Sequence, residues 1–255
     1  MTDEQTKVTS SVAGDTQFLA APSPLLLAVG GLIGSILGLG LYRAIYPIFL
    51  IPDEILNIPS PPPVALIAKL EAYQLRVDCQ NYPIVFGLMG LSIGATCAMF
   101  ALQGRILGVA LTSILGGILG AAGALLCAMI VGNSRATAGS DIVLVGITID
   151  SLAQAIIGQA CIWGLMGCGV GAGIGLTTQG FFGALKVACA GLWGGAFGAL
   201  VFVVGAAVLA PNSSSNHVVP LPIQEQIALT CLAGVCIGFA IGLGFNSRKK
   251  KTAAL

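Results

Sequence analysis

The chain has 255 residues, of which 56% are hydrophobic and only 8% are charged. Soluble domains carry about 25% charged residues, so this composition predicts an integral membrane protein and argues against a soluble one. The 11 basic and 10 acidic residues nearly cancel, which leaves no basic field of the kind that binds nucleic acid.

The polar N-terminal segment, residues 1–23, begins with Met-Thr-Asp-Glu-Gln. A secretory signal has a short positive region before its apolar core, so we interpret this segment as a flexible tail instead. Residues 24–246 form one predicted membrane domain. The C-terminal tail, residues 247–255, contains four consecutive cations: Arg248, Lys249, Lys250 and Lys251.

Six apolar segments are long enough to cross a bilayer, because a spanning helix needs about 20 mostly apolar residues. In chain order they are Leu25–Tyr42, Tyr82–Leu102, Ile106–Val131, Ala155–Leu176, Phe181–Leu209 and Ile227–Phe245. The sequence therefore predicts an all-α bundle of six transmembrane helices. Arg43 directly follows the first segment and is expected to anchor it at the membrane surface.

A proline cluster between the first two segments predicts an extended linker. It is followed by VALIAKLEAYQLRVDC, residues 64–79, which places apolar side chains on one side and Lys69, Arg76 and Asp78 on others. This pattern predicts a short amphipathic helix on the membrane surface. A second segment of this kind, DIVLVGITIDSL (residues 141–152), precedes the fourth apolar segment.

The chain contains an internal repeat. FGLMGLSIGA, starting at Phe86, and WGLMGCGVGA, starting at Trp163, are identical at six of ten positions, and LGGILGA and WGGAFGA follow in the same order. Both copies carry Gln-Gly between their helices, at 103–104 and 179–180. We interpret about 64–132 and about 141–210 as tandem copies of a glycine-rich helical hairpin, with one residue inserted.

Glycines recur at a spacing of four in several predicted helices, which places them on one ridge of each helix. Ridges of small residues let helix backbones approach closely in a membrane, so the pattern predicts glycine-zipper packing. The predicted packing glycines are Gly30, Gly34, Gly38, Gly90, Gly94, Gly167, Gly171, Gly175, Gly234, Gly238 and Gly242. The partner across each ridge stays open: this chain, another protein or a bound small molecule.

Polar residues at the start of the fourth segment are the candidates for a solute path. Asp150 and Gln154 share one helical face, and Gln159 is close by; ionisable groups inside a membrane are functional hypotheses by default. The alternative, which the repeat alignment favours, places Asp150 at the membrane interface. Lys186 is expected to extend to the headgroups at the opposite face.

With six crossings, both termini lie on one side of the membrane. Lysine and arginine are more frequent on that side, so the positive-inside rule predicts cytoplasmic termini. Seven of the eight cysteines lie within apolar runs and there is no Cys/His cluster, so we predict no metal site and no cofactor.

The sequence brings no nucleophile and base together, so we do not expect an enzyme. It favours a non-catalytic structural or assembly subunit in the lipid bilayer, joined through its glycine ridges to further copies or to a larger membrane complex. The alternative is a channel or transporter for a small solute, with its polar path near Asp150, Gln154 and Gln159.

Overall fold

The computed structural model describes residues 22–49, 64–103, 105–137, 149–209 and 223–246. This part of the chain contains five helices and no strand: α2 (Pro24–Ile45), α4 (Val64–Leu102), α5 (Ile106–Thr137), α6 (Ile149–Leu209) and α7 (Ile223–Asn246). Each helix contains a stretch that is long and apolar enough to cross a membrane.

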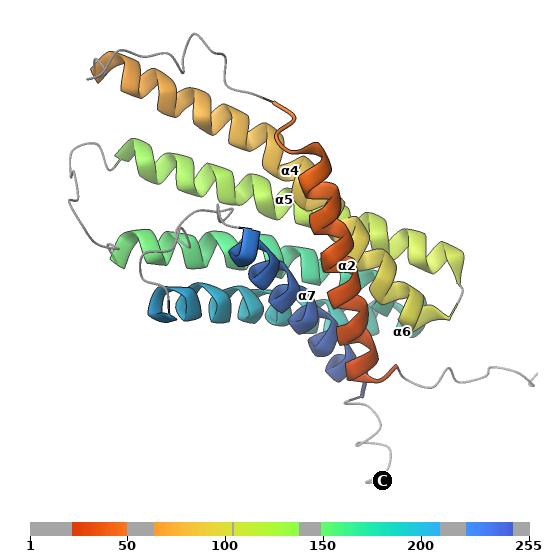
Figure 1. Cartoon of the computed structure of the whole chain (residues 1–255). Helices are drawn as coiled ribbons and strands as arrows, with labels where there is room; N and C mark the ends of the chain where they lie inside the picture. Colours follow the sequence, from red (N-terminus) through yellow and green to blue (C-terminus); the bar gives the residue numbers. More distant parts are fainter. Residues whose placement is uncertain (1–21, 50–63, 104, 138–148, 210–222, 247–255) are drawn as a thin grey trace, which may run out of the picture.

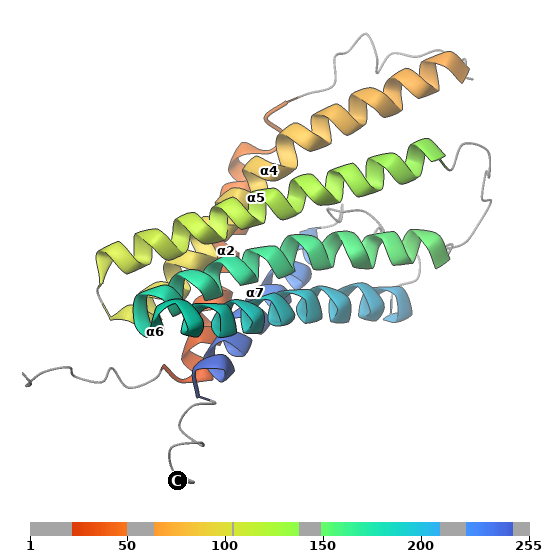
Figure 2. The same ribbon diagram turned by 180° about the vertical axis from the view of Figure 1, so that it is seen from behind.

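Helix α6 has 61 residues, but it is not one straight rod. Its backbone leaves the helical conformation at Gly180, where φ is 73° and ψ is −171°, a conformation that glycine adopts at little cost because it has no Cβ. The two arms on either side pack antiparallel, with Gly167 against Gly191 and Gly175 against Ala184. Helix α6 is therefore a helical hairpin, and its arms lie side by side in Figures 1 and 2.

The helices close into a ring. Helix α2 packs against α4, α4 against α5, α5 against α6, α6 against α7, and α7 returns to α2. Helices α4, α5 and both arms of α6 run side by side, while α2 and α7 cross them obliquely (Figures 1 and 2). The start of α2 meets the end of α7, since Gly242 lies against Pro24.

The prediction of a separate surface helix at 64–79 is wrong. Helix α4 is continuous over 39 residues and includes Pro83. Proline lacks the N–H of a helical hydrogen bond, but membrane helices tolerate it because neighbouring groups satisfy the freed backbone. The polar stretch before Pro83 continues the helix because backbone hydrogen bonds do not depend on side-chain polarity.

Other helices also extend beyond the predicted segments. Helix α5 continues to Thr137, and α6 begins at Ile149. Of the second predicted surface segment, the described part is the first turn of α6. The tail up to residue 21, most of the proline linker, residues 210–222 and the C-terminal tail lie outside the described residues.

The centre of the ring is filled with apolar side chains. Trp163 and Ile174 from α6, Ile93 from α4 and Ile237 from α7 are all 0% exposed. The Phe86 and Trp163 rings pack edge to face with their centroids 6.0 Å apart. Lipid is as apolar as these side chains, so close packing and not removal from water holds such a centre together.

Large apolar side chains also cover the outside. Ile106, Leu107 and Phe182 are more than 80% exposed, and many similar residues surround them. Soluble monomers rarely expose large contiguous apolar patches, whereas a bilayer covers them without cost. The outer surface thus agrees with the hydropathy of the helices.

Candidate functional site

Every glycine that the spacing singled out lies against a neighbouring helix of the same chain. The ridge of α2 faces α4: a Cβ added at Gly30 would lie 3.2 Å from the Cα of Cys97, and one at Gly38 would lie 3.0 Å from the Cα of Met89. Gly90 and Gly94 face α5, the ridge of Gly167, Gly171 and Gly175 faces the second arm of α6, and the ridge of Gly234, Gly238 and Gly242 faces α2.

Three helix pairs share one type of contact, in which two glycines lie against each other's carbonyl oxygens. The pairs are Gly31 with Gly234, Gly90 with Gly116, and Gly167 with Gly191. Between them they join α2 to α7, α4 to α5, and the two arms of α6. The spacing of four predicts one partner in each pair, whereas Gly31, Gly116 and Gly191 are not among the predicted packing glycines.

The densest glycine stretch, residues 164–175, supplies two ridges. Gly167, Gly171 and Gly175 face the second arm of α6, while Gly169 lies against Leu115 and Gly173 against Thr112 of α5. Residues two positions apart point to different sides of a helix. The first arm of α6 is therefore closely packed on two sides at once, which explains the alternate glycines of this stretch.

One hydroxyl strengthens the contact between α2 and α4. Thr96 is buried, and its Oγ1 donates to the Gly30 carbonyl oxygen at 2.7 Å, with the Ser92 carbonyl oxygen of its own helix at 3.0 Å. Interhelical hydrogen bonds of this type contribute about 0.6 kcal/mol on average in membrane proteins.

Buried polar side chains gather where α2 ends. Asn81 of α4 is 1% exposed and binds the segment that follows α2. Its Oδ1 accepts hydrogen bonds from the backbone N–H groups of Ile48 and Phe49 at 3.1 and 2.9 Å, and its Nδ2 donates to the Phe49 carbonyl oxygen at 2.9 Å. Asn81 thereby fixes the chain as it leaves α2.

Two tyrosines and two further polar groups complete this polar end. The Tyr42 and Tyr46 rings stack with centroids 4.9 Å apart. Tyr42 is hydrogen-bonded to Gln226 of α7, and Asp78, which is 9% exposed, lies close enough to Tyr46 to interact with it electrostatically. Burial first, and then Asp78, raise the pKa of Tyr46 above its ordinary value of 10.0, so this phenol is neutral at physiological pH.

The predicted path residues lie at the start of the first arm of α6. Gln159 is 1% exposed, and its Oε1 accepts a hydrogen bond from the Trp163 indole N–H at 3.0 Å. Gln154 is half-buried, and the side chain of Asp150 lies outside the described residues. Asp78 and Asn81 are the buried polar groups of α4 nearest to the polar end of the bundle. The sequence predicts Asp78 in a surface helix and does not single out Asn81.

The predicted anchors lie at helix ends or outside the described chain. Arg43 is exposed in the last turn of α2, and Lys186 is half-buried in the second arm of α6, shortly after the turn at Gly180. The four cations Arg248, Lys249, Lys250 and Lys251 belong to the part that is not described.

Replacing Asn81 with leucine is expected to lower the free energy of unfolding by about 2 kcal/mol. The change removes three hydrogen bonds of about 0.6–1 kcal/mol each and leaves two backbone N–H groups unpaired. Thermal unfolding in detergent measures the effect. Gln80→Leu, at the exposed neighbouring position, is the control and should change stability by less than about 0.5 kcal/mol; equal losses for both variants would show that the Asn81 contacts contribute nothing.

The described residues contain no group of three histidine, cysteine or acidic side chains placed to hold a metal ion. Cysteines at 97 and 127 are buried, and all eight thiols are free.

The helices, their apolar surfaces and the ring of contacts define an integral, multi-pass α-helical membrane protein. No family model, no curated protein and no solved structure matches the chain.

Proposed function

We propose that the chain is a non-catalytic structural subunit that crosses the bilayer six times and helps to assemble or shape a larger membrane complex. The observation that carries this proposal is the interior of the ring. Side chains of four helices that are 0% exposed, among them Leu27, Ile93, Trp163 and Ile237, fill it with hydrocarbon.

Six crossings follow if each arm of α6 spans the membrane separately. The arms pack antiparallel on either side of Gly180, and each exceeds the length of about 20 residues that a bilayer requires. Both termini are then on one side, which the distribution of lysine and arginine makes the cytoplasmic side.

The contacts between glycines also support duplication of the hairpin. In each hairpin the two contacting glycines stand equally far along the sequence from the glutamine at the turn, one before it and one after it. The first hairpin pairs Gly90 with Gly116 about Gln103, and the second pairs Gly167 with Gly191 about Gln179. This symmetry about the glutamine of each turn supports the proposal that the two hairpins are copies of one unit.

One difference between the copies is a small shift of register in the second arm. The sequence repeat matches LGGILGA with WGGAFGA and so aligns Gly116 with Gly194, whereas the glycine that makes the equivalent contact is Gly191. These two glycines of α6 are close to one helical turn apart, so the same face of the second arm still meets the first arm.

The glycine ridges are occupied within the chain, so contacts with further subunits must use the outer surface. Trp193 and Phe197 are 72% and 59% exposed and lie one turn apart on the second arm of α6. The ridges therefore account for the stability of the subunit rather than for its partners.

A transporter is the alternative function, and the buried polar groups around Asp78 and Asn81 are what favour it. Secondary transporters place ligands near the bilayer midplane, typically at broken helices. Here the only described polar group of α6 that is nine-tenths or more buried is Gln159, and it serves as acceptor for Trp163. The large side chains that fill the centre of the ring are otherwise apolar among the described residues.

Reconstitution in liposomes tests the proposal. We expect wild-type protein to give no flux of small ions, sugars or amino acids above that of protein-free liposomes, with a known channel reconstituted in parallel as the positive control. Flux that is present in the wild type and abolished by Asp150→Asn or Gln159→Leu would instead establish the transporter and overturn the structural subunit.

A further inference from the structure

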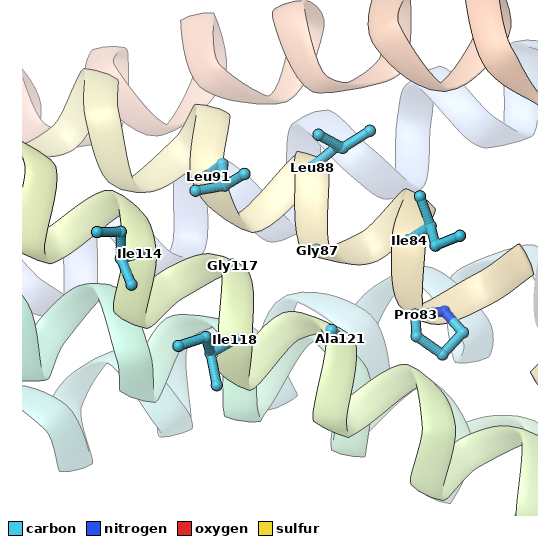
Figure 3. Close-up of a pocket in the computed structure, with 9 residues that line it drawn as sticks. All are labelled: Pro83, Ile84, Gly87, Leu88, Leu91, Ile114, Gly117, Ile118 and Ala121. Atoms are coloured by element: carbon cyan, nitrogen blue, oxygen red, sulfur yellow. The ribbon is translucent and has the colours of Figure 1, made fainter. Parts of the chain in front are cut away.

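An apolar groove of about 330 Å³ opens on the outer surface between α4 and α5 (Figure 3). Pro83, Gly87 and Leu91 line it from α4, and Ile114, Gly117 and Ala121 line it from α5. Its walls expose almost only carbon. The groove lies within the stretches Leu75–Leu102 and Ile106–Ile130, which are long and apolar enough to cross a membrane.

The groove exists because its floor lacks side chains. A Cβ added at Gly87 would lie 3.4 Å from both the Ala121 Cβ and the Gly117 carbonyl oxygen, so the space above the floor is not filled by the protein. Ile84 and Ile118, at 41% and 58% exposed, stand at its edges. Its length from Pro83 to Leu91 is about 12 Å along the helix, at about 1.5 Å per residue.

The number of residues between Pro83 and the turn at Gln103 places the edge of the hydrocarbon core near Pro83, at one end of the groove. Pro83 closely follows Asn81, which binds the segment leaving α2. The part of α4 from Pro83 to the turn at Gln103 has about the 20 residues that the hydrocarbon core requires. The groove therefore runs inward from the surface along the helices, in the direction of a lipid acyl chain.

A cation lies above that end on the same face of α4. Arg76 is exposed and precedes Pro83 by close to two helical turns, and the exposed Gln80 lies between them. Arg76 therefore projects on the groove side, about 10 Å further out. The headgroup layer extends about 5–7 Å beyond the hydrocarbon, and an arginine stem readily bridges the remaining distance.

We propose that this surface is a binding site for one anionic phospholipid. An acyl chain fills the groove from Pro83 to Leu91, and the phosphate accepts charge-assisted hydrogen bonds from the Arg76 guanidinium, which matches phosphate oxygens geometrically. A cation near the membrane surface contributes about 1 kcal/mol toward an anionic lipid, so the site should prefer phosphatidylglycerol over phosphatidylcholine about fivefold. The proposal holds for a structural subunit and for a transporter alike.

Photocrosslinking tests it with the full chain in phosphatidylcholine nanodiscs. Each sample contains a trace of phosphatidylglycerol or phosphatidylcholine with a diazirine in one acyl chain, and mass spectrometry locates the adducts. We expect adducts to concentrate in residues 83–91 and 114–121, with about a fivefold higher yield for phosphatidylglycerol. Adducts spread evenly over all outward-facing segments would overturn the proposal.

Two variants separate the groove from the cation. Arg76→Gln should remove the preference for phosphatidylglycerol and leave the phosphatidylcholine adducts in place. The control is Arg105→Gln, which replaces an exposed cation at the opposite end of the bundle and should leave the preference intact.

Ala121→Leu should reduce adducts of both lipids several-fold. The control is Ala110→Leu, which makes the same change at an exposed position elsewhere on α5 and should not reduce them. If Ala121→Leu fails to fold, Gly87→Ala fills part of the groove at ordinary contact distance. An unchanged preference in Arg76→Gln, or unchanged adducts in the filled groove, would contradict the site.

Discussion

Replacing Gly238 with leucine is expected to prevent the bundle from folding, with a loss of at least about 3 kcal/mol. A Cβ at this position would overlap the Leu27 carbonyl oxygen and lie 3.0 Å from the Ala28 Cα. Both neighbours are backbone, so the clash cannot be relieved by a change of rotamer. Gly171→Leu should have the same effect, because its Cβ would overlap the Val187 carbonyl oxygen.

The matched control for these variants is Gly40→Leu. Gly40 lies in α2 and is exposed, and a Cβ added there meets nothing within 4 Å. The same substitution should therefore be neutral, or stabilising by up to about 1 kcal/mol through helix propensity. Thermal unfolding in detergent, together with the yield of monodisperse protein, distinguishes the three variants. If Gly238→Leu and Gly40→Leu behaved alike, the close contact between α2 and α7 would not exist.

Replacing Gly180 with valine is expected to destabilise the α6 hairpin by about 3 kcal/mol. The positive φ of 73° combined with a ψ of −171° belongs to a region that is essentially restricted to glycine, and such strain costs on the order of 1–3 kcal/mol, more for a β-branched residue. An added Cβ at Gly180 meets nothing within 4 Å, so the cost comes from the backbone and not from a clash.

The other turn supplies the opposite substitution. Gln103 is a non-glycine residue with a φ of 43°, and Gln103→Gly should relieve about 1 kcal/mol of this strain. Denaturation in mixed detergent micelles, followed by tryptophan fluorescence, measures both changes. A fall in stability for Gln103→Gly, or none for Gly180→Val, would be incompatible with the turn conformations described above.

The sequence predicts much of the packing but not the identity of the partners. A spacing of four places Gly234 and Gly238 on one ridge, and both meet another helix. Their partner is α2, at the other end of the described chain, and no local pattern encodes that pairing. Gly31 escaped the prediction because the spacing of four selects Gly30, while the contact with Gly234 uses the adjacent position.

The contacts at the polar end of the bundle could not be predicted from the sequence either, because they join residues that are far apart in the chain. Asn81 lies in a polar run before a proline, a context typical of a surface segment, but it binds Ile48 and Phe49 on the far side of the proline linker. The Gln159 contact could have been predicted, because Trp163 follows four residues later and the two side chains share a face of the helix. The polar path near Asp150, Gln154 and Gln159 stays a prediction, because the side chain of Asp150 lies outside the described residues.

The central claim is that the two arms of α6 pack against each other within one chain. Two native cysteines test this claim most directly. Cys168 directly follows Gly167 in the first arm of α6, and Cys189 lies two residues before Gly191 in the second arm, so both flank the contact of Gly167 with Gly191. In a straight helix these cysteines would lie about 31 Å apart, beyond the reach of a short bis-maleimide. With the other six cysteines replaced by serine, the folded protein should gain the mass of one reagent, lose both thiols and stay monomeric in denaturing electrophoresis. Two separate additions per chain, or crosslinked dimers, would contradict the hairpin and the intramolecular glycine contacts on which the proposed function depends.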